Sequence, residues 1–204
     1  MAKKPTRSEE DKALEQAVAL LEQMAAWDST HKLAVQYAKP WPHLGGPYPW
    51  QVEYHDKGSE FHQRAIIAGN RVGKTRTAAA EVAIHLTGQY PDWWKGYRFK
   101  TPVVGCVCNT TNESLRDVTQ LELIGNIRGD GDTASRNIDG TGWIPLDCIG
   151  EHKFRQGGIS NLLDTLEVKH VSGGWSKVYF KSYAQGQSAF QGTKWHFAWP
   201  DEEP

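Results

Sequence analysis

The sequence is poor in several features that define common protein classes. Its 204 residues include only three cysteines, too few for a disulfide framework. No apolar run approaches the length of a membrane span, and the N-terminus lacks the apolar core of a signal peptide. The 23 lysines and arginines are balanced by 24 acidic residues, so charge neither points to nucleic acid nor excludes it. The length fits one domain with an N-terminal appendage.

The three cysteines fit a packing role better than a metal site. Cys106 and Cys108 share one face of a strand predicted over residues 103–108, where they serve as small core residues. Zinc binding by these two with Cys148 and nearby histidines is the alternative. Their spacing matches no known structural zinc site, so we predict none.

One glycine-rich stretch predicts a phosphate-binding loop. It runs through Ala68, Gly69, Asn70, Arg71, Val72, Gly73, Lys74 and Thr75. Backbone N–H groups near its glycines can approach a triphosphate, Lys74 reaches the β- and γ-phosphates, and the Thr75 hydroxyl binds Mg²⁺. The general pattern places glycine five residues before Gly73, where this chain has Ala68, so the loop is a variant.

The surroundings of this loop fit the same interpretation. Residues 64–68 form a short apolar run that predicts a buried parallel strand. Residues 75–86 are rich in alanine and predict a helix that ends at Gly88. In that order the helix N-terminus and its dipole meet the phosphates. The alternative is that Gly73, Lys74 and Thr75 lie in an unrelated turn.

The last residues of the sequence supply carboxylates. Residues 195–199 are apolar and aromatic and predict a strand, and Pro200 is tolerable only near its end. Asp201 is the predicted Mg²⁺ ligand, directly or through water. Glu202 is the predicted base or water-positioning group, with Glu203 as its rival. The alternative is an acidic, solvated tail.

Four stretches together resemble motifs of the large terminase subunits, the DNA-packaging motors of tailed bacteriophages. Residues 49–55 resemble the segment that recognises adenine, with Gln51 as the residue that reads the base; the alternative is an ordinary surface glutamine. Residues 68–75 resemble the deviant Walker A motif, and residues 182–192 the stretch before Walker B. Residues 199–204 resemble the Walker B motif itself.

The resemblance implies an α/β P-loop fold of the additional-strand (ASCE) type in residues 39–204, with a mostly parallel sheet flanked by helices. It implies ATP and Mg²⁺ as cofactors, phosphate contacts from residues 69–75, and Thr75 and Asp201 at the metal. It also gives Arg71 a catalytic role at the γ-phosphate, where a guanidinium stabilises developing charge. The alternative for Arg71 is a solvated side chain at the loop tip.

By the same resemblance, the full motor hydrolyses ATP to drive double-stranded DNA into a procapsid in the host cytoplasm. Its partners are a portal protein, a small terminase subunit, DNA and further copies in a ring. Complete family members continue into a coupling motif and a nuclease domain, and this sequence stops just after Walker B. Turnover of ATP by this part alone therefore stays open.

Two other functions remain open. Another P-loop nucleic-acid motor, such as a helicase, also has an acidic pair after a strand. A truncated remnant would bind nucleotide without turnover, or bind nothing, because the strand and coupling residues beyond residue 204 are missing.

The remaining elements before the second core strand follow from periodicity and chain breakers. Residues 1–38 combine a basic tail with an amphipathic helix over residues 8–27, which we expect to pack on its own domain rather than on a neighbouring subunit. Residues 39–50 form a proline-rich connector. Residues 91–100 mix aromatic and cationic residues, and we expect an inward-packed loop rather than a base-stacking surface.

The second half of the sequence predicts a capped helix, a loop and a hairpin. Asn109 or Thr111 caps the helix after residues 103–108. Residues 125–142 predict a loop, and residues 152–158 a basic tip on a flexible stretch that could contact DNA. Residues 166–171 and 177–183 alternate around a Gly-Gly pair and predict a hairpin.

Overall fold

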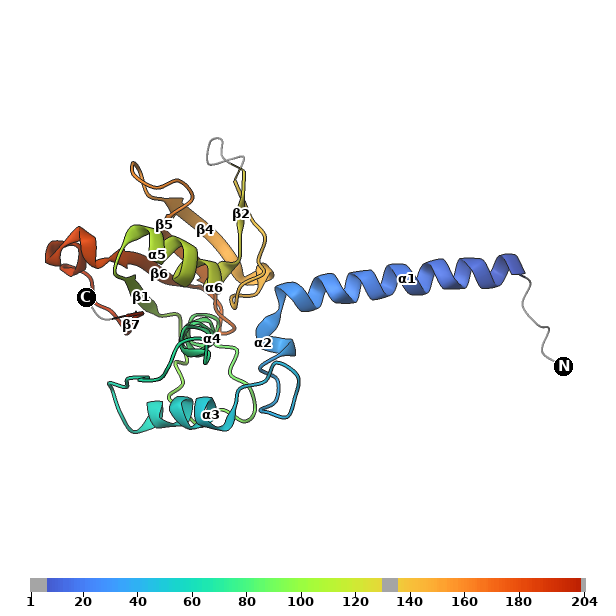
Figure 1. The fold of residues 1–204 in the computed structure, drawn as a ribbon, viewed down its shortest axis with the longest axis horizontal. Helices are drawn as coiled ribbons and strands as arrows, with labels where there is room; N and C mark the ends of the chain where they lie inside the picture. Colours follow the sequence, from blue (N-terminus) through green and yellow to red (C-terminus); the bar gives the residue numbers. More distant parts are fainter. Residues whose placement is uncertain (1–6, 130–135, 203–204) are drawn as a thin grey trace.

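The computed structural model describes residues 7–129 and 136–202 of the chain, built around a five-stranded sheet (Figure 1). The strand order is β4-β5-β6-β1-β7. The strands are β1 Val104–Asn109, β4 Ile149–Phe154, β5 Leu163–Lys169, β6 Trp175–Ser182 and β7 Phe197–Pro200. A second, two-stranded sheet pairs β2 Ile127–Arg128 with β3 Asn137–Ile138 inside the predicted loop.

The main sheet is mixed. β1 lies between β6 and β7 and is parallel to both, with Val107 opposite Phe180 and Trp199. β5 is antiparallel to β4 and to β6. β5 and β6 form the predicted hairpin, where Gly173 and Gly174 both take the positive φ that a tight turn requires. The predicted α/β class is confirmed, with two parallel and two antiparallel strand pairings.

Helix α4, Lys74–Thr87, lies at the centre of the core and contacts β1, β5 and β6. Its alanines at positions 79, 80 and 83 are fully buried, because small side chains let a helix approach a sheet closely. The helix ends where Gly88 adopts a left-handed conformation and its N–H donates to the Ile84 carbonyl. The helix and its C-terminal glycine were both predicted from the sequence and are confirmed.

A second helical stretch packs beside α4. It consists of α5 Asn112–Ser114, the π-helical η2 Leu115–Gln120 and α6 Leu121–Ile124. Thr111 caps it, since its hydroxyl accepts a hydrogen bond from the Ser114 N–H at 3.1 Å. This confirms one of the two predicted capping residues.

The segment before the loop folds back over α4. The short helices α2 Lys32–Val35 and α3 Pro49–Asp56 flank the proline-rich connector, and the turn η1 Lys57–Ser59 continues α3. α3 is joined to α4 by side-chain hydrogen bonds described below. The loop over residues 91–100 packs aromatic side chains inward as predicted, with Trp94 only 3% exposed.

Residues 64–68 do not form the predicted strand. Ile67 is 96% exposed, and residues 62–67 make no backbone hydrogen bond to the described part of the chain. The physical reason is the lack of a partner. β7 is the last strand of the sheet, and no described strand lies beyond it to offer a ladder to this apolar run.

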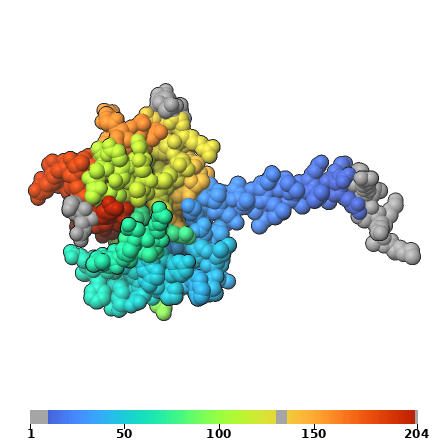
Figure 2. Space-filling view, in the orientation of Figure 1, coloured from blue at the N-terminus to red at the C-terminus, as the bar shows by residue number. Residues whose placement is uncertain are grey.

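Helix α1, Arg7–Thr30, also departs from expectation. It extends away from the body as a single rod instead of packing on its own domain (Figures 1 and 2). Leu14, Leu20 and Leu21 are each more than half exposed. Contact with the body begins directly after the helix, where His31 Nε2 lies 3.4 Å from Asp147 Oδ1, and continues at Leu33 and Tyr37, which are buried.

Two smaller predictions, on the cysteines and on residues 152–158, can be compared with the structure. Cys106 and Cys108 are buried on one face of β1 with their Sγ atoms 3.5 Å apart, which confirms their packing role. Of the stretch 152–158, predicted as a basic tip on a flexible segment, residues 152–154 belong to β4, and residues 155–158 lie in the connection between β4 and β5. The 3-10 turns η4 Leu146–Cys148, η5 Tyr183–Gln185 and η6 Gln187–Phe190 lie in the segments that connect the strands.

No helix in the described ranges is long and apolar enough to cross a membrane.

Candidate nucleotide site

The glycine-rich loop leads directly into the N-terminus of α4. Arg71 has φ +61° and Gly73 has φ +92°, so the chain turns sharply before the helix begins. The first hydrogen bond of the helix runs from the Thr77 N–H to the Gly73 carbonyl at 2.9 Å. The N–H groups of Lys74, Thr75 and Arg76 therefore lack intrahelical acceptors at the positive end of the helix dipole. Such an end attracts anions.

Lys74 is folded back over its own loop. Its Nζ donates to the carbonyl oxygens of Ala68 at 2.6 Å and Gly69 at 3.0 Å. These two contacts bridge the start and the end of the loop. A phosphate group that binds here would offer the ammonium a charged acceptor in place of two neutral ones.

Thr75 and Asp201 lie side by side, although 126 positions separate them in the sequence. The Thr75 hydroxyl donates to the two Asp201 carboxylate oxygens at 3.3 and 3.4 Å. Asp201 is held by its backbone N–H, which donates to the Cys108 carbonyl at 2.9 Å and so extends the pairing of β7 with β1. The structure thus brings together the two residues that the sequence predicted as metal ligands.

The Asp201 carboxylate is poorly compensated. Burial raises its pKa above the ordinary 3.8; the hydrogen bond from Thr75 opposes this rise and the charge of Glu202 adds to it. A hydroxyl and a carboxylate are hard oxygen donors, and Mg²⁺ in proteins is held by one or two such groups with water completing its shell. The donor set therefore fits Mg²⁺. No group of three or more His, Cys, Asp or Glu side chains gathers as metal ligands in the described ranges.

The two candidate catalytic carboxylates are Glu202 and Glu203, and the structure describes only Glu202. Glu202 is exposed, next to Asp201, and has φ +69°, a conformation that turns the chain sharply at the end of β7. Glu203, its rival, lies outside the described residues. The choice between them stays a prediction. Arg71 is exposed at the tip of the loop, close in sequence to Lys74, and its catalytic role also stays a prediction.

Gln51 lies behind the loop rather than open to solvent. It sits in the first turn of α3 and is 4% exposed. Its Oε1 accepts from the Tyr48 N–H at 2.8 Å, and its Nε2 donates to the Thr77 hydroxyl at 2.5 Å. The amide joins α3 to α4 through one of its two N–H groups. Because the side chain is buried, it can contact a base only after a local rearrangement.

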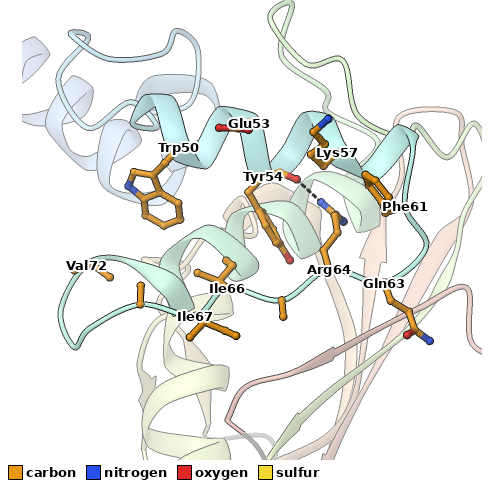
Figure 3. Close-up of a pocket in the computed structure, with 12 residues that line it drawn as sticks. Trp50, Glu53, Tyr54, Lys57, Phe61, Gln63, Arg64, Ile66, Ile67 and Val72 are labelled. Carbon is orange, nitrogen blue, oxygen red and sulfur yellow. Dashed lines mark hydrogen bonds between the residues drawn. The ribbon is translucent and has the colours of Figure 1, made fainter.

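A hollow of about 680 Å³ opens beside the loop (Figure 3). One wall is α3, which contributes Trp50 and Tyr54, and the other is the stretch leading into the loop, with Ile66, Ile67 and Val72. Arg64 lies at its far end and donates to the Tyr54 carbonyl. The hollow is aromatic and aliphatic, and it reaches the loop at Ala68 and Val72.

Sequence reasoning missed the ionic cluster under this hollow. Glu81 of α4 contacts Arg64, His55 and His85, and all four side chains are largely withdrawn from solvent. The available signal was a glutamate inside a helix face made of alanine and isoleucine, where a charge requires a partner.

Comparison with known proteins follows from these features. The family described as "Terminase large subunit, T4likevirus-type, N-terminal" matches residues 65–204. The chain is also 38% identical over 202 residues to the "Terminase, large subunit" of Salmonella phage P22, an alignment that covers 91% of this chain. The chain spans 37% of the length of that relative. No solved structure gives a significant match.

The fold and the site define an α/β protein in which a glycine-rich loop at a helix N-terminus faces a carboxylate at the end of a strand. Together with the family match over most of its length, this chain belongs to the large terminase subunits of bacteriophages, as the N-terminal part of that family.

Proposed function

We propose that this chain is the ATPase part of a phage DNA-packaging motor, which couples ATP hydrolysis to the movement of double-stranded DNA into a procapsid. The observation that carries the proposal is the contact between Thr75 and Asp201, which joins the loop to the end of β7 at a pair of hard oxygen ligands. Membership in the large terminase family supplies the biological role. The fold it implies is a P-loop ATPase of the additional-strand type.

The residues around the loop divide the work of binding. The backbone from Gly69 to Gly73, including Asn70 and Val72, would line the phosphates, and Lys74 would leave its loop carbonyls to neutralise them. Mg²⁺, when bound, neutralises phosphate charge and orients the γ-phosphate. Thr75 and Asp201 would hold it, and the metal would place positive charge beside the ionised Asp201 carboxylate.

Hydrolysis requires a positioned water and stabilisation of developing charge. Glu202 would orient the water beside the γ-phosphate, and Arg71 at the loop tip would stabilise the transition state. Gln51 would contact adenine after a local rearrangement, because its side chain is buried and does not line the hollow between α3 and the loop.

The partners belong to the proposal as well. A large terminase subunit of this kind would act in the host cytoplasm on double-stranded DNA, with a portal protein, a small terminase subunit and further copies of itself in a ring. The "Terminase, large subunit" of phage P22 supports the packaging role.

The test is Mg²⁺-dependent ATP binding and hydrolysis by residues 1–204, measured beside Lys74→Ala. We expect the substitution to abolish ATP binding, because it removes the charge that meets the β- and γ-phosphates. Lys153→Ala, on the exposed part of β4, is the matched control and should bind as the wild type does. Equal affinity in Lys74→Ala and wild type would contradict the site assignment.

One observation favours a second outcome for this chain on its own. Residues 64–68 lack a strand partner within the described residues, so the stretch that leads into the loop is not held by a sheet. Binding of ATP without turnover would then be the activity of this chain by itself. Single-turnover hydrolysis with excess protein distinguishes this case from a complete active site.

A further inference from the structure

We propose that Arg64 and Glu81 are positioning residues for the nucleotide loop, and that their buried ion pair holds the loop in the conformation that binds triphosphate. The inference rests on the proposed function. It adds a role for two residues that lie outside the glycine-rich loop at residues 68–75 and outside the acidic motif at residues 199–204.

The stretch that enters the loop needs such a support. In the described chain, the backbone of residues 62–67 forms no hydrogen bond, and Ile67 is 96% exposed. The far end of the loop is fixed, because Gly73 and Lys74 begin α4. At the near end, the side chain of Arg64 makes the hydrogen bonds that tie this stretch to the body of the protein.

The Arg64 guanidinium contacts a carbonyl, a carboxylate and an aromatic ring at once. Its Nη1 donates to the Tyr54 carbonyl at 2.7 Å and to Glu81 Oε2 at 3.3 Å, while Nη2 donates to Glu81 Oε1. Its carbon also lies 4.6 Å from the centre of the Tyr54 ring. A planar fork that spans a carboxylate, a carbonyl and an aromatic face is a property of arginine, which lysine cannot reproduce. Gly58 leaves room for it, since an added Cβ there would lie 3.2 Å from the guanidinium.

Glu81 connects this support to the phosphate end of the site. It lies on α4, about two turns after Lys74, so the helix that closes the loop also holds its entrance. Its Oε2 lies 2.9 Å from His55 Nδ1 on α3, and its Oε1 lies 3.3 Å from His85 Nε2 on α4. The carboxylate thereby ties α3, α4 and the loop entrance into one unit.

The competing role is a purely structural one. Buried ion pairs are often worth little net stability, yet breaking one partner is costly. A structural pair would change the free energy of unfolding and leave the nucleotide affinity of the folded chain unchanged. A positioning pair would change the affinity and the local opening of residues 65–72 as well.

The experiment compares Arg64→Lys with Arg155→Lys in the full chain. Arg155 is a matched control, because it is also largely buried and donates to Asn112 and to the Phe180 carbonyl, away from the loop. Affinity for ATP with Mg²⁺ is measured at a temperature where every variant is folded, together with the rate at which trypsin cleaves the loop after Arg71. We expect Arg64→Lys to lose about tenfold in affinity, which equals ~1.4 kcal/mol, and to be cleaved faster within residues 65–72. Arg155→Lys should do neither.

A double variant separates position from stability. Arg64→Met with Glu81→Leu removes both charges, so it should regain much of the stability that a single change loses. Its affinity should remain low, because the hydrogen bonds that hold the loop entrance are gone. Wild-type affinity and a wild-type rate of trypsin cleavage within residues 65–72 in Arg64→Lys would overturn the proposal. If the wild type itself binds no ATP, the proposed function fails, while the cleavage rate within residues 65–72 still decides whether the pair holds the loop.

Discussion

At the residue scale, the partly buried carboxylate of Asp201 lowers the stability of the fold when it is ionised. Burial raises its pKa above 3.8, which means that the folded state disfavours the ionised carboxylate. The cost is absent at a pH below the unfolded pKa and complete at a pH above the raised folded pKa. Near neutral pH the ionised carboxylate therefore lowers the stability of the fold, and the proposed binding of Mg²⁺ would offset this cost.

Asp201→Asn should consequently raise the melting temperature of the nucleotide-free chain near neutral pH. The same change should weaken binding of Mg²⁺ with ATP roughly tenfold or more, because a charged metal ligand is lost. Thermal melts with and without Mg²⁺ and ATP measure both effects. Asp117→Asn, at an exposed acid of η2, is the control and should leave ATP binding unchanged. A lower melting temperature in Asp201→Asn would contradict this account.

The pKa of Glu81 is shifted in the opposite direction to that of Asp201. Burial alone would raise its pKa, but hydrogen bonds from His55, His85 and Arg64 outweigh burial and hold the pKa well below the ordinary 4.5. Its contribution to stability is therefore complete above pH 4.5 and is lost as the pH falls toward the lower folded value.

We expect Glu81→Gln to cost ~3 kcal/mol of unfolding free energy at neutral pH, because it leaves a buried arginine without its counter-charge. The difference from wild type should shrink as the pH is lowered below 4.5. Urea denaturation at a series of pH values checks both statements. A difference that stays constant across the series would show that the charge of Glu81 is not its source.

At the element scale, the parts that the sequence predicted are those with local signals. The helix at α4, the Gly88 end, the Thr111 cap and the hairpin of β5 and β6 follow from neighbouring residues alone. The contact of Thr75 with Asp201 was predicted through motif order, which carries long-range information.

The elements that could not be predicted depend on partners. Residues 64–68 have the composition of a buried strand, but a strand exists only beside another, and none is described there. Apolar spacing in α1 predicts a helix without saying what covers it. Arg64 and Glu81 are 17 positions apart, and no spacing rule links an arginine before a loop to a glutamate within the next helix.

The end of α4 gives a test of backbone conformation. Gly88 has φ +71°, and an added Cβ would lie 2.4 Å from His170 Nε2. Gly88→Ala should therefore lose more unfolding free energy than backbone strain alone, which is about 1–2 kcal/mol. Gly157→Ala isolates the strain, because Gly157 also has positive φ but has nothing within 4 Å of the added atom. Equal losses in the two variants, measured by urea denaturation, would remove the clash with His170 as a cause.

At the scale of the whole molecule, α1 and the body share few contacts. The helix projects from the body (Figure 2). Its leucines are exposed, whereas the core is built from residue 33 onward. Stability of the body should therefore not require α1.

Deletion of residues 1–28 should leave the melting temperature within about 2 °C of the full chain and leave ATP binding unchanged, since no core residue is removed. Differential scanning calorimetry and nucleotide titration are the measurements. A large fall in melting temperature would mean that the exposed face of α1 is covered in solution by contacts with the body.

The contacts of Lys74 affect which anions the chain can bind. Its ammonium donates to two acceptors, the carbonyls of Ala68 and Gly69, so an anion that binds Lys74 must replace these hydrogen bonds. A single phosphate or sulfate offers Lys74 one charged group, while a triphosphate with its metal brings several charged oxygens at once. We therefore expect the chain to bind a nucleoside triphosphate with Mg²⁺ more tightly than it binds a single phosphate or sulfate.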